Sequence, residues 1–136
     1  MTRRAFAYAC IGGPLLRPDD RKISIRGTLA SGPDDKPALR MSGGNAVMPS
    51  GDEPTEGVLR DKRVIGTEVE FIGHYTAPDR FRIDPIHTKA IFSWKNGRRQ
   101  YITYWCEVCS IRTYTPGACW CCQQDTALDI RDNYEQ

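Results

Sequence analysis

Two Cys-x-x-Cys pairs near the end of the chain, here called knuckles, constrain its folding more than any other feature. The first is Cys106 and Cys109, the second is Cys119 and Cys122, and nine residues lie between them. Cysteines at this spacing turn both sulfurs toward one ion, while neighbouring backbone N–H groups offset the charge of the thiolates. The pattern predicts one tetrahedral metal site with these four cysteines as ligands.

A fifth cysteine, Cys121, is an alternative ligand, because it forms a second pair with Cys119. The equal spacing of the two knuckles favours Cys122 and leaves Cys121 as a free thiol. Disulfides are the weaker interpretation, since five of the six cysteines fall within residues 106–122 and adjacent cysteines pair poorly with each other. Cys10 lies too far from this cluster in sequence to be assigned.

Four thiolates leave no open coordination position, so the site is expected to be structural and to order the C-terminal third of the chain. Zn²⁺ is the expected ion. Iron is the alternative, because the same tetrahedral sulfur set holds iron and passes one electron. Trp105 and Trp120 stand next to cysteines and are expected to shield the ion.

Length and charge define the class of protein. A chain of 136 residues, 40% hydrophobic and 26% charged, suits one small globular domain that a metal would help to stabilise. The net charge is +2, and residues 1–20 hold three arginines and two aspartates, which leaves 16 basic against 15 acidic residues. This balance disfavours a globally basic nucleic-acid binder.

The N-terminal segment has the layout of a targeting peptide, with two arginines before an apolar run from Ala5 to Leu16. Thr2-Arg3-Arg4-Ala5-Phe6 resembles the twin-arginine export signal, which implies an exported protein, periplasmic or envelope-associated. The alternative is a cytoplasmic protein in which this segment is a basic tail or an apolar element packed on the domain. No transmembrane helix is expected, because the run would span about 18 Å of a core about 30 Å thick.

Alternation of apolar and polar residues predicts short strands along the rest of the chain. Residues 22–29 and 38–41 are expected to pair, and residues 42–57 are expected to be a plain surface loop. One helical turn is predicted within residues 58–65. In residues 67–75, Val69, Phe71 and Tyr75 are expected to face inward, with Gly73 placed where a small barrel bends.

Asn96-Gly97 predicts a tight hairpin between strands at residues 88–95 and 98–105, and residues 126–130 predict a closing strand. Phe92 and Trp94 are expected on one face, with the lysines and Ile91 opposite. The aromatic residues around this hairpin are expected to fill the core. Together with the nearby basic residues, they also suggest a surface for single-stranded nucleic acid, which is the disfavoured alternative. These basic and aromatic residues are Lys89, Lys95, Arg98, Arg99, Phe92, Trp94, Tyr101, Tyr104 and Trp105.

These elements predict an all-β fold, a small barrel or sandwich with a metal ribbon at its C-terminal end. The strand pattern of residues 21–95 resembles small OB-like barrels, and residues 104–130 resemble a zinc ribbon or rubredoxin knuckles. We therefore expect a leader or tail at residues 1–20, an OB-like domain at 21–105, a zinc-ribbon extension at 106–130 and a frayed tail at 131–136.

No residue pattern indicates a reaction. His74 and His87 lack an acidic partner at a telling spacing and are expected to be surface or hydrogen-bonded histidines. The first functional hypothesis is therefore a binding or accessory module, with another protein or an envelope complex as its partner. A rubredoxin-like electron carrier and a cytoplasmic single-stranded nucleic-acid binder are the alternatives.

Overall fold

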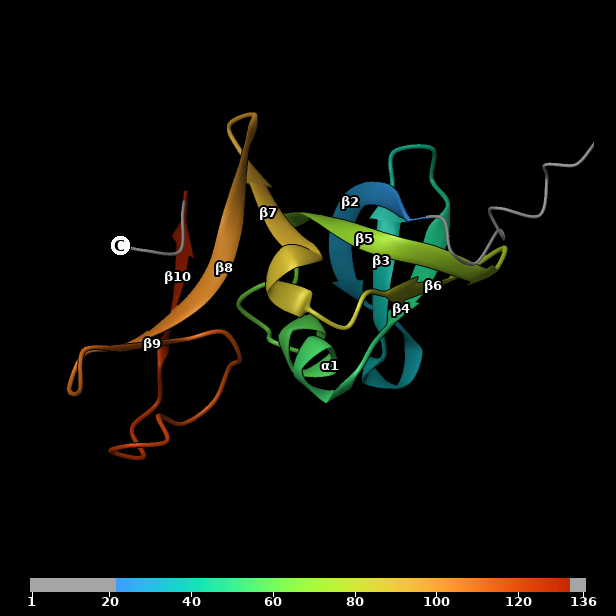
Figure 1. Cartoon of the computed structure of the whole chain (residues 1–136). Coiled ribbons are helices and arrows are strands. Elements are labelled where there is room, and N and C mark those ends of the chain that lie inside the picture. The colour runs from blue at the N-terminus through green and yellow to red at the C-terminus, as the bar shows by residue number, and fades with distance from the viewer. Residues whose placement is uncertain (1–21, 133–136) are drawn as a thin grey trace, which may run out of the picture.

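The computed structural model of the chain describes residues 22–132 and has the predicted all-β fold (Figure 1). The predicted leader lies outside these residues. The strands are β2 (Ile23–Ser31), β3 (Pro37–Met41), β4 (Ala46–Ser50), β5 (Glu68–Ala77), β6 (Arg80–Ile83), β7 (Ile91–Lys95), β8 (Arg98–Cys106), β9 (Ile111–Thr113) and β10 (Ala127–Arg131). The helical segments are α1 (Glu53–Leu59) and the 3-10 turns η3 (Pro33–Asp35) and η4 (His87–Lys89). Within residues 22–132, no helix is both long and apolar enough to cross a membrane.

Five strands close into a barrel. β2 pairs with β3 and β5, β3 pairs with β4, and β5 pairs with β6, all antiparallel. A parallel pairing of β4 with β6 completes the ring. The helix α1 lies between the third and fourth barrel strands of the chain, β4 and β5. This closed Greek-key arrangement confirms the prediction of a small OB-like barrel.

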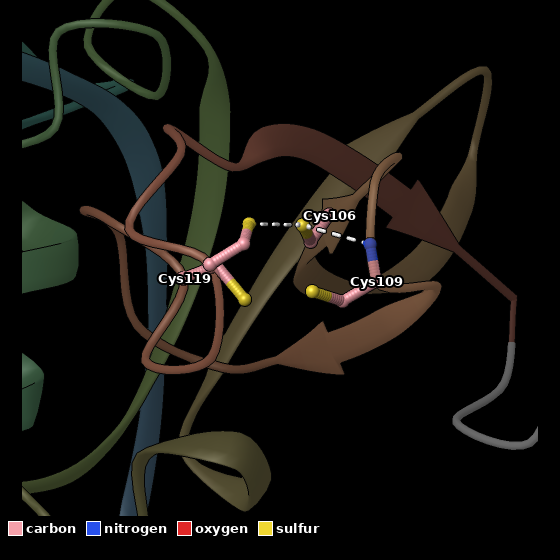
Figure 2. Close-up of side chains that lie close together, drawn as sticks. Cys106, Cys109 and Cys119 are labelled. Atoms are coloured by element: carbon pink, nitrogen blue, oxygen red, sulfur yellow. Dashed lines mark hydrogen bonds between the residues drawn. The ribbon is translucent and has the colours of Figure 1, made fainter.

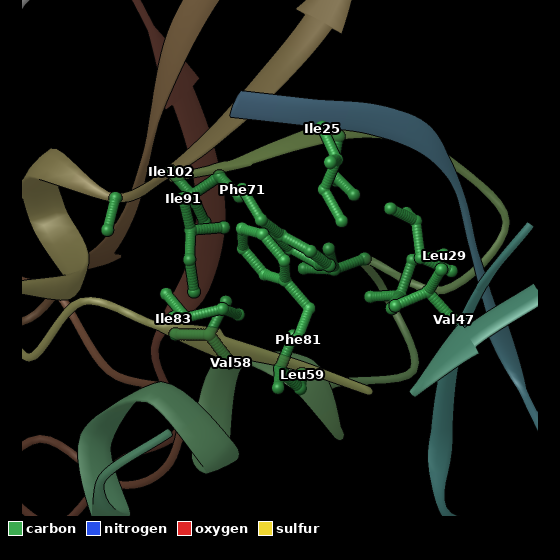
Figure 3. Close-up of a cluster of buried hydrophobic side chains, with 14 of the residues drawn as sticks. Ile25, Leu29, Val47, Val58, Leu59, Phe71, Phe81, Ile83, Ile91 and Ile102 are labelled. Atoms are coloured by element: carbon green, nitrogen blue, oxygen red, sulfur yellow. The ribbon is translucent and has the colours of Figure 1, made fainter. Parts of the chain in front are cut away.

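The barrel encloses the hydrophobic core, and α1 covers one end of it (Figure 3). Val58 and Leu59 of α1 are at most 1% exposed. Asp52 is the N-cap of the helix, and its carboxylate accepts hydrogen bonds from the backbone N–H and hydroxyl of Thr55 at 3.1 and 2.7 Å. The prediction of a plain loop over residues 42–57 is therefore wrong, because β4 and most of α1 lie there. Both elements are too short to show a clear period.

Gly73 lies where two barrel strands come close together. A Cβ atom at this position would stand 2.0 Å from the carbonyl oxygen of Arg82 in β6. The close approach of the two backbones explains the glycine at the predicted bend. Two residues further along β5, Tyr75 packs edge-on against Phe81 with ring centroids 5.2 Å apart, yet it stays 39% exposed because the strand runs past the end of the core.

An extension of the sheet leaves the barrel through β5, which also pairs with β7. β7 and β8 form the predicted hairpin, with φ of 54° at Asn96 and 75° at Gly97. β8 then pairs with both β9 and β10, and its last residue is Cys106. The extension therefore carries the cysteines away from the barrel core (Figure 1).

The two faces of the extension differ from the prediction. Ile91 pairs with Phe71 in β5, so it shares the core face and is 3% exposed. Phe92 pairs with Glu70 and lies on the opposite face, beneath Arg99. The expectation that the aromatic face of this strand is the core face is wrong, because the register of β7 against β5 reverses the two faces.

Candidate metal centre

The four predicted cysteines come together at the end of β8 (Figure 2). The sulfur atoms of Cys106, Cys109, Cys119 and Cys122 all lie within 4.8 Å of one another, and those of Cys106 and Cys122 are 3.5 Å apart. A tetrahedral zinc ion with Zn–S bonds of about 2.3 Å requires sulfur–sulfur distances of about 3.8 Å. The cluster therefore has the size and donor set of a metal site.

Both knuckles stabilise their first sulfur in the same way. The backbone N–H of Cys109 donates to the sulfur of Cys106 at 3.4 Å, and the N–H of Cys121 donates to the sulfur of Cys119 at 3.4 Å. Such bonds favour the thiolate, the form that binds metal. Backbone N–H groups of Cys122 and Cys121 accordingly lower the pKa of the Cys119 thiol to about 7.

Both knuckles also end in the same turn. The N–H of Ser110 donates to the carbonyl of Cys106 at 2.9 Å, and that of Gln123 donates to the carbonyl of Cys119 at 2.8 Å. Ser110 and Gln123 have φ of 54° and 67°, in the left-handed region that favours glycine. These turns could not be predicted from the sequence, because the usual glycine is absent from both.

Burial divides the five cysteines within residues 22–132 into three groups. Cys106 and Cys119 are fully buried and Cys109 and Cys122 are partly buried, whereas Cys121 is exposed. Cys121 is outside the group of four close sulfurs. The neighbouring thiols of Cys121 and Cys122 raise the pKa of Cys109 above its usual value. A cation would offset the charge that these crowded thiolates otherwise share.

The expected shielding by tryptophan is wrong for one of the two residues. Trp120, within the second knuckle, is 73% exposed and so does not cover the sulfurs. Trp105 is partly buried, and the guanidinium of Arg112 lies over its ring, 4.9 Å from the centroid. Val108, in the first knuckle, is 70% exposed.

Hydrogen bonds dock the segment between the knuckles onto the barrel. Nε2 of His87 lies 2.6 Å from the carbonyl oxygen of Tyr114, so the histidine has the hydrogen-bonding role predicted for it. Arg63 donates to the carbonyl of Thr126 at 2.8 Å, and the hydroxyl of Thr126 donates to the carbonyl of Gly117 at 2.9 Å. These bonds fix both ends of the second knuckle.

A buried carboxylate that sequence reasoning missed holds β8 beside the barrel. Asp61 accepts a hydrogen bond from the hydroxyl of Tyr104 at 2.8 Å and from Nε of Arg63 at 3.0 Å. Tyr104 is fully buried and Asp61 is 9% exposed. Burial would raise the pKa of Asp61, but the hydrogen bonds from Arg63 and Tyr104 outweigh it and lower the pKa.

A second buried carboxylate, Glu70, binds the hairpin whose basic and aromatic residues suggested nucleic-acid binding as the disfavoured alternative. It accepts hydrogen bonds from Trp94 at 2.8 Å, from Arg99 at 2.9 and 2.6 Å, and from the hydroxyl of Ser24. The guanidinium of Arg26 stacks on Trp94, 3.8 Å from its centroid. Arg99 and Trp94 of this hairpin therefore already have partners within the chain.

Comparisons of the chain with family models, with curated proteins and with solved structures find no match.

Proposed function

We propose that this protein is a small binding or accessory module whose C-terminal part is ordered by a structural zinc ion. The observation that carries the proposal is the group of four sulfurs within 4.8 Å of one another. A tetrahedral ion bound by all four has no position left for a substrate, so its role is to stabilise the fold. Cys106, Cys109, Cys119 and Cys122 are the proposed ligands, with Cys121 as the alternative.

The burial pattern of this segment supports the proposed role of a metal. Between residues 107 and 125, Cys119 is the only buried residue. A stretch of this length with a single buried side chain offsets little of the conformational entropy that it loses on folding. Binding of zinc supplies that free energy, because the site forms only when the chain folds.

Metal analysis of protein purified without added zinc tests this proposal. We expect one zinc ion per chain, lost in Cys122→Ser and retained in the matched variant Cys121→Ser. A chain without metal that remains fully folded would refute the structural role. Loss of zinc in Cys121→Ser but not in Cys122→Ser would reassign the fourth ligand.

A rubredoxin-like electron carrier is the alternative that the same four sulfurs favour, since iron takes the same coordination. The partial exposure of Cys109 and Cys122 would allow an electron to reach an ion there. A coloured protein with an Fe(III)–thiolate absorption spectrum would select this alternative, and a colourless protein with one zinc would reject it.

Export by the twin-arginine route is part of the proposal. The route is known for carrying folded proteins, so the thiolates would bind zinc in the reducing cytoplasm before transfer. Arg3→Lys combined with Arg4→Lys should keep the protein in the cytoplasm of an expressing bacterium. Unchanged transfer of this variant, or no transfer of the native chain, would refute export.

Binding of single-stranded nucleic acid is the cytoplasmic alternative. Nucleic acid would have to displace Glu70 from Arg99 and Trp94 at the hairpin. Retention on single-stranded DNA at about 150 mM salt tests it, because counterion release weakens nonspecific binding at that salt concentration.

A further inference from the structure

The core face of the sheet continues beyond the barrel as an open groove. A hollow of about 670 Å³ lies between the segment that contains Val64 and the face of β7, β8 and β10. Its floor is apolar: Val64 and Ile102 are buried, and Leu128 and Ile130 are partly buried. This volume is within the range of ligand-binding sites.

An unpaired strand edge borders this groove. Among the strands of residues 22–132, β10 pairs only with β8, so its other edge has no partner (Figure 1). Leu128 and Ile130 belong to β10 and line the groove, so the edge and the apolar floor are adjacent. A free edge beside an apolar groove is the arrangement that accepts an added peptide strand, with backbone hydrogen bonds along the edge and alternate side chains in the groove.

The hairpin end of the groove is positively charged. Lys95 and Arg98 pair across the turn of the β7–β8 hairpin, and both line the groove. Arg98 forms an exposed ion pair with Asp132, whereas within residues 22–132 Lys95 has no ion pair. The one carboxylate that lines the groove, Glu68, is bonded to Arg26 at 2.6 Å. An exposed pair contributes little free energy, so Arg98 can exchange Asp132 for an incoming carboxylate.

The distance between two residues of β8 sets the spacing of apolar and acidic side chains in a ligand of the groove. Ile102 and Arg98 lie on the same face of the strand, four residues apart, which corresponds to about 14 Å. A peptide strand that follows the groove therefore places apolar side chains at alternate positions and an acidic side chain about four residues further toward the hairpin.

We propose that the groove binds an extended peptide of a partner protein, with alternating apolar residues followed by acidic ones, as an added strand on β10. This inference deepens the proposed function and rests on it, because the second knuckle leads directly into β10. Charge favours this occupant over the basic N-terminal segment of the chain itself, whose arginines would face Lys95 and Arg98.

Fluorescence anisotropy with synthetic octapeptides tests the inference. The probes alternate threonine with valine, leucine or phenylalanine and end in two glutamates. One set of control probes ends in two lysines instead, and the other set has every second backbone amide N-methylated. We expect at least one glutamate probe to bind and both kinds of control to bind at least tenfold more weakly. Lys95→Glu combined with Arg98→Glu should weaken that probe at least tenfold, whereas Lys36→Glu, an exposed site outside the groove, should change it less than twofold.

The metal content of the same samples separates the two proposals. A zinc-loaded chain that binds none of the glutamate probes would overturn the peptide site and leave the structural zinc intact. Equal binding of the N-methylated probes would overturn strand addition, and equal binding of the lysine probes would overturn the role of Lys95 and Arg98. Peptide binding by a folded, metal-free chain would support the groove and refute the zinc proposal.

Discussion

Replacing Glu70 by glutamine removes the negative charge of a buried side chain while keeping its shape. The native carboxylate is 6% exposed and accepts hydrogen bonds from Ser24, Trp94 and two nitrogens of Arg99. These partners come from β2, β7 and β8, so the carboxylate joins the hairpin to the barrel. The variant also mimics the protonated acid, which links the mutation to the effect of pH.

The shift of the pKa gives the magnitude. Burial would raise the pKa of Glu70, but hydrogen bonds from Arg99, Ser24 and Trp94 outweigh it and lower the pKa from its ordinary 4.5 to about 2. At 1.36 kcal/mol for each pKa unit, the charged form contributes at most about 3.4 kcal/mol to the free energy of unfolding. Because Arg99 is 46% exposed and solvent screens its charge, we expect a loss of about 2–3 kcal/mol in Glu70→Gln at pH 7.

The pH dependence follows from the direction of the shift. A carboxylate whose pKa is lower in the folded state stabilises the protein fully above pH 4.5, and this contribution is lost as the pH falls toward 2. Urea unfolding followed by tryptophan fluorescence should therefore show a difference between native protein and variant that shrinks to about 1 kcal/mol at pH 3 and nearly vanishes at pH 2. The difference is the quantity to compare, because acid protonates the cysteine thiolates that we propose as metal ligands in both proteins.

A matched control lies two residues away on the same strand. Glu68 forms an exposed ion pair with Arg26, with side chains 45% and 46% exposed, so Glu68→Gln should cost less than about 1 kcal/mol. A loss below about 1 kcal/mol in Glu70→Gln at pH 7, or a loss that stays constant down to pH 3, would show that the Glu70 network does not hold the hairpin on the barrel.

Three further substitutions test the backbone and the buried contacts. Gly73→Ala places a methyl group against a backbone oxygen and should cost more than about 3 kcal/mol in urea unfolding, whereas Gly43→Ala, with open space around it, should cost less than about 0.5 kcal/mol. Tyr104→Phe leaves the buried Asp61 without one donor and should cost about 1–3 kcal/mol, with the metal content unchanged. Ser110→Gly relieves the left-handed backbone at the first knuckle and should raise the free energy of unfolding by up to about 1 kcal/mol, and a loss would contradict this.

Much of the fold could be predicted because the period of the side chains is local information. The hairpin at Asn96-Gly97 and the strands at residues 22–29, 67–75 and 98–105 all occur where alternation and turn residues place them. The loop over residues 42–57 was mispredicted because β4 has five residues and α1 has seven, too few to establish a period. The N-cap Asp52, followed by Pro54 and Glu56, was the signal that could have revealed α1.

The sequence by itself identified the four cysteines that come together, because the spacing within each knuckle requires only local turns to bring two sulfurs together. It also determined the all-β class. Only the tertiary structure decided which face of β7 is buried, since register between strands sets that choice and a shift of one residue reverses it. It also decided the roles of Glu70 and Asp61. The partners of Glu70 lie 24 to 46 residues away along the chain, and Tyr104, which bonds to Asp61, lies 43 residues away. Those contacts form only when the tertiary structure brings segments distant in the sequence side by side.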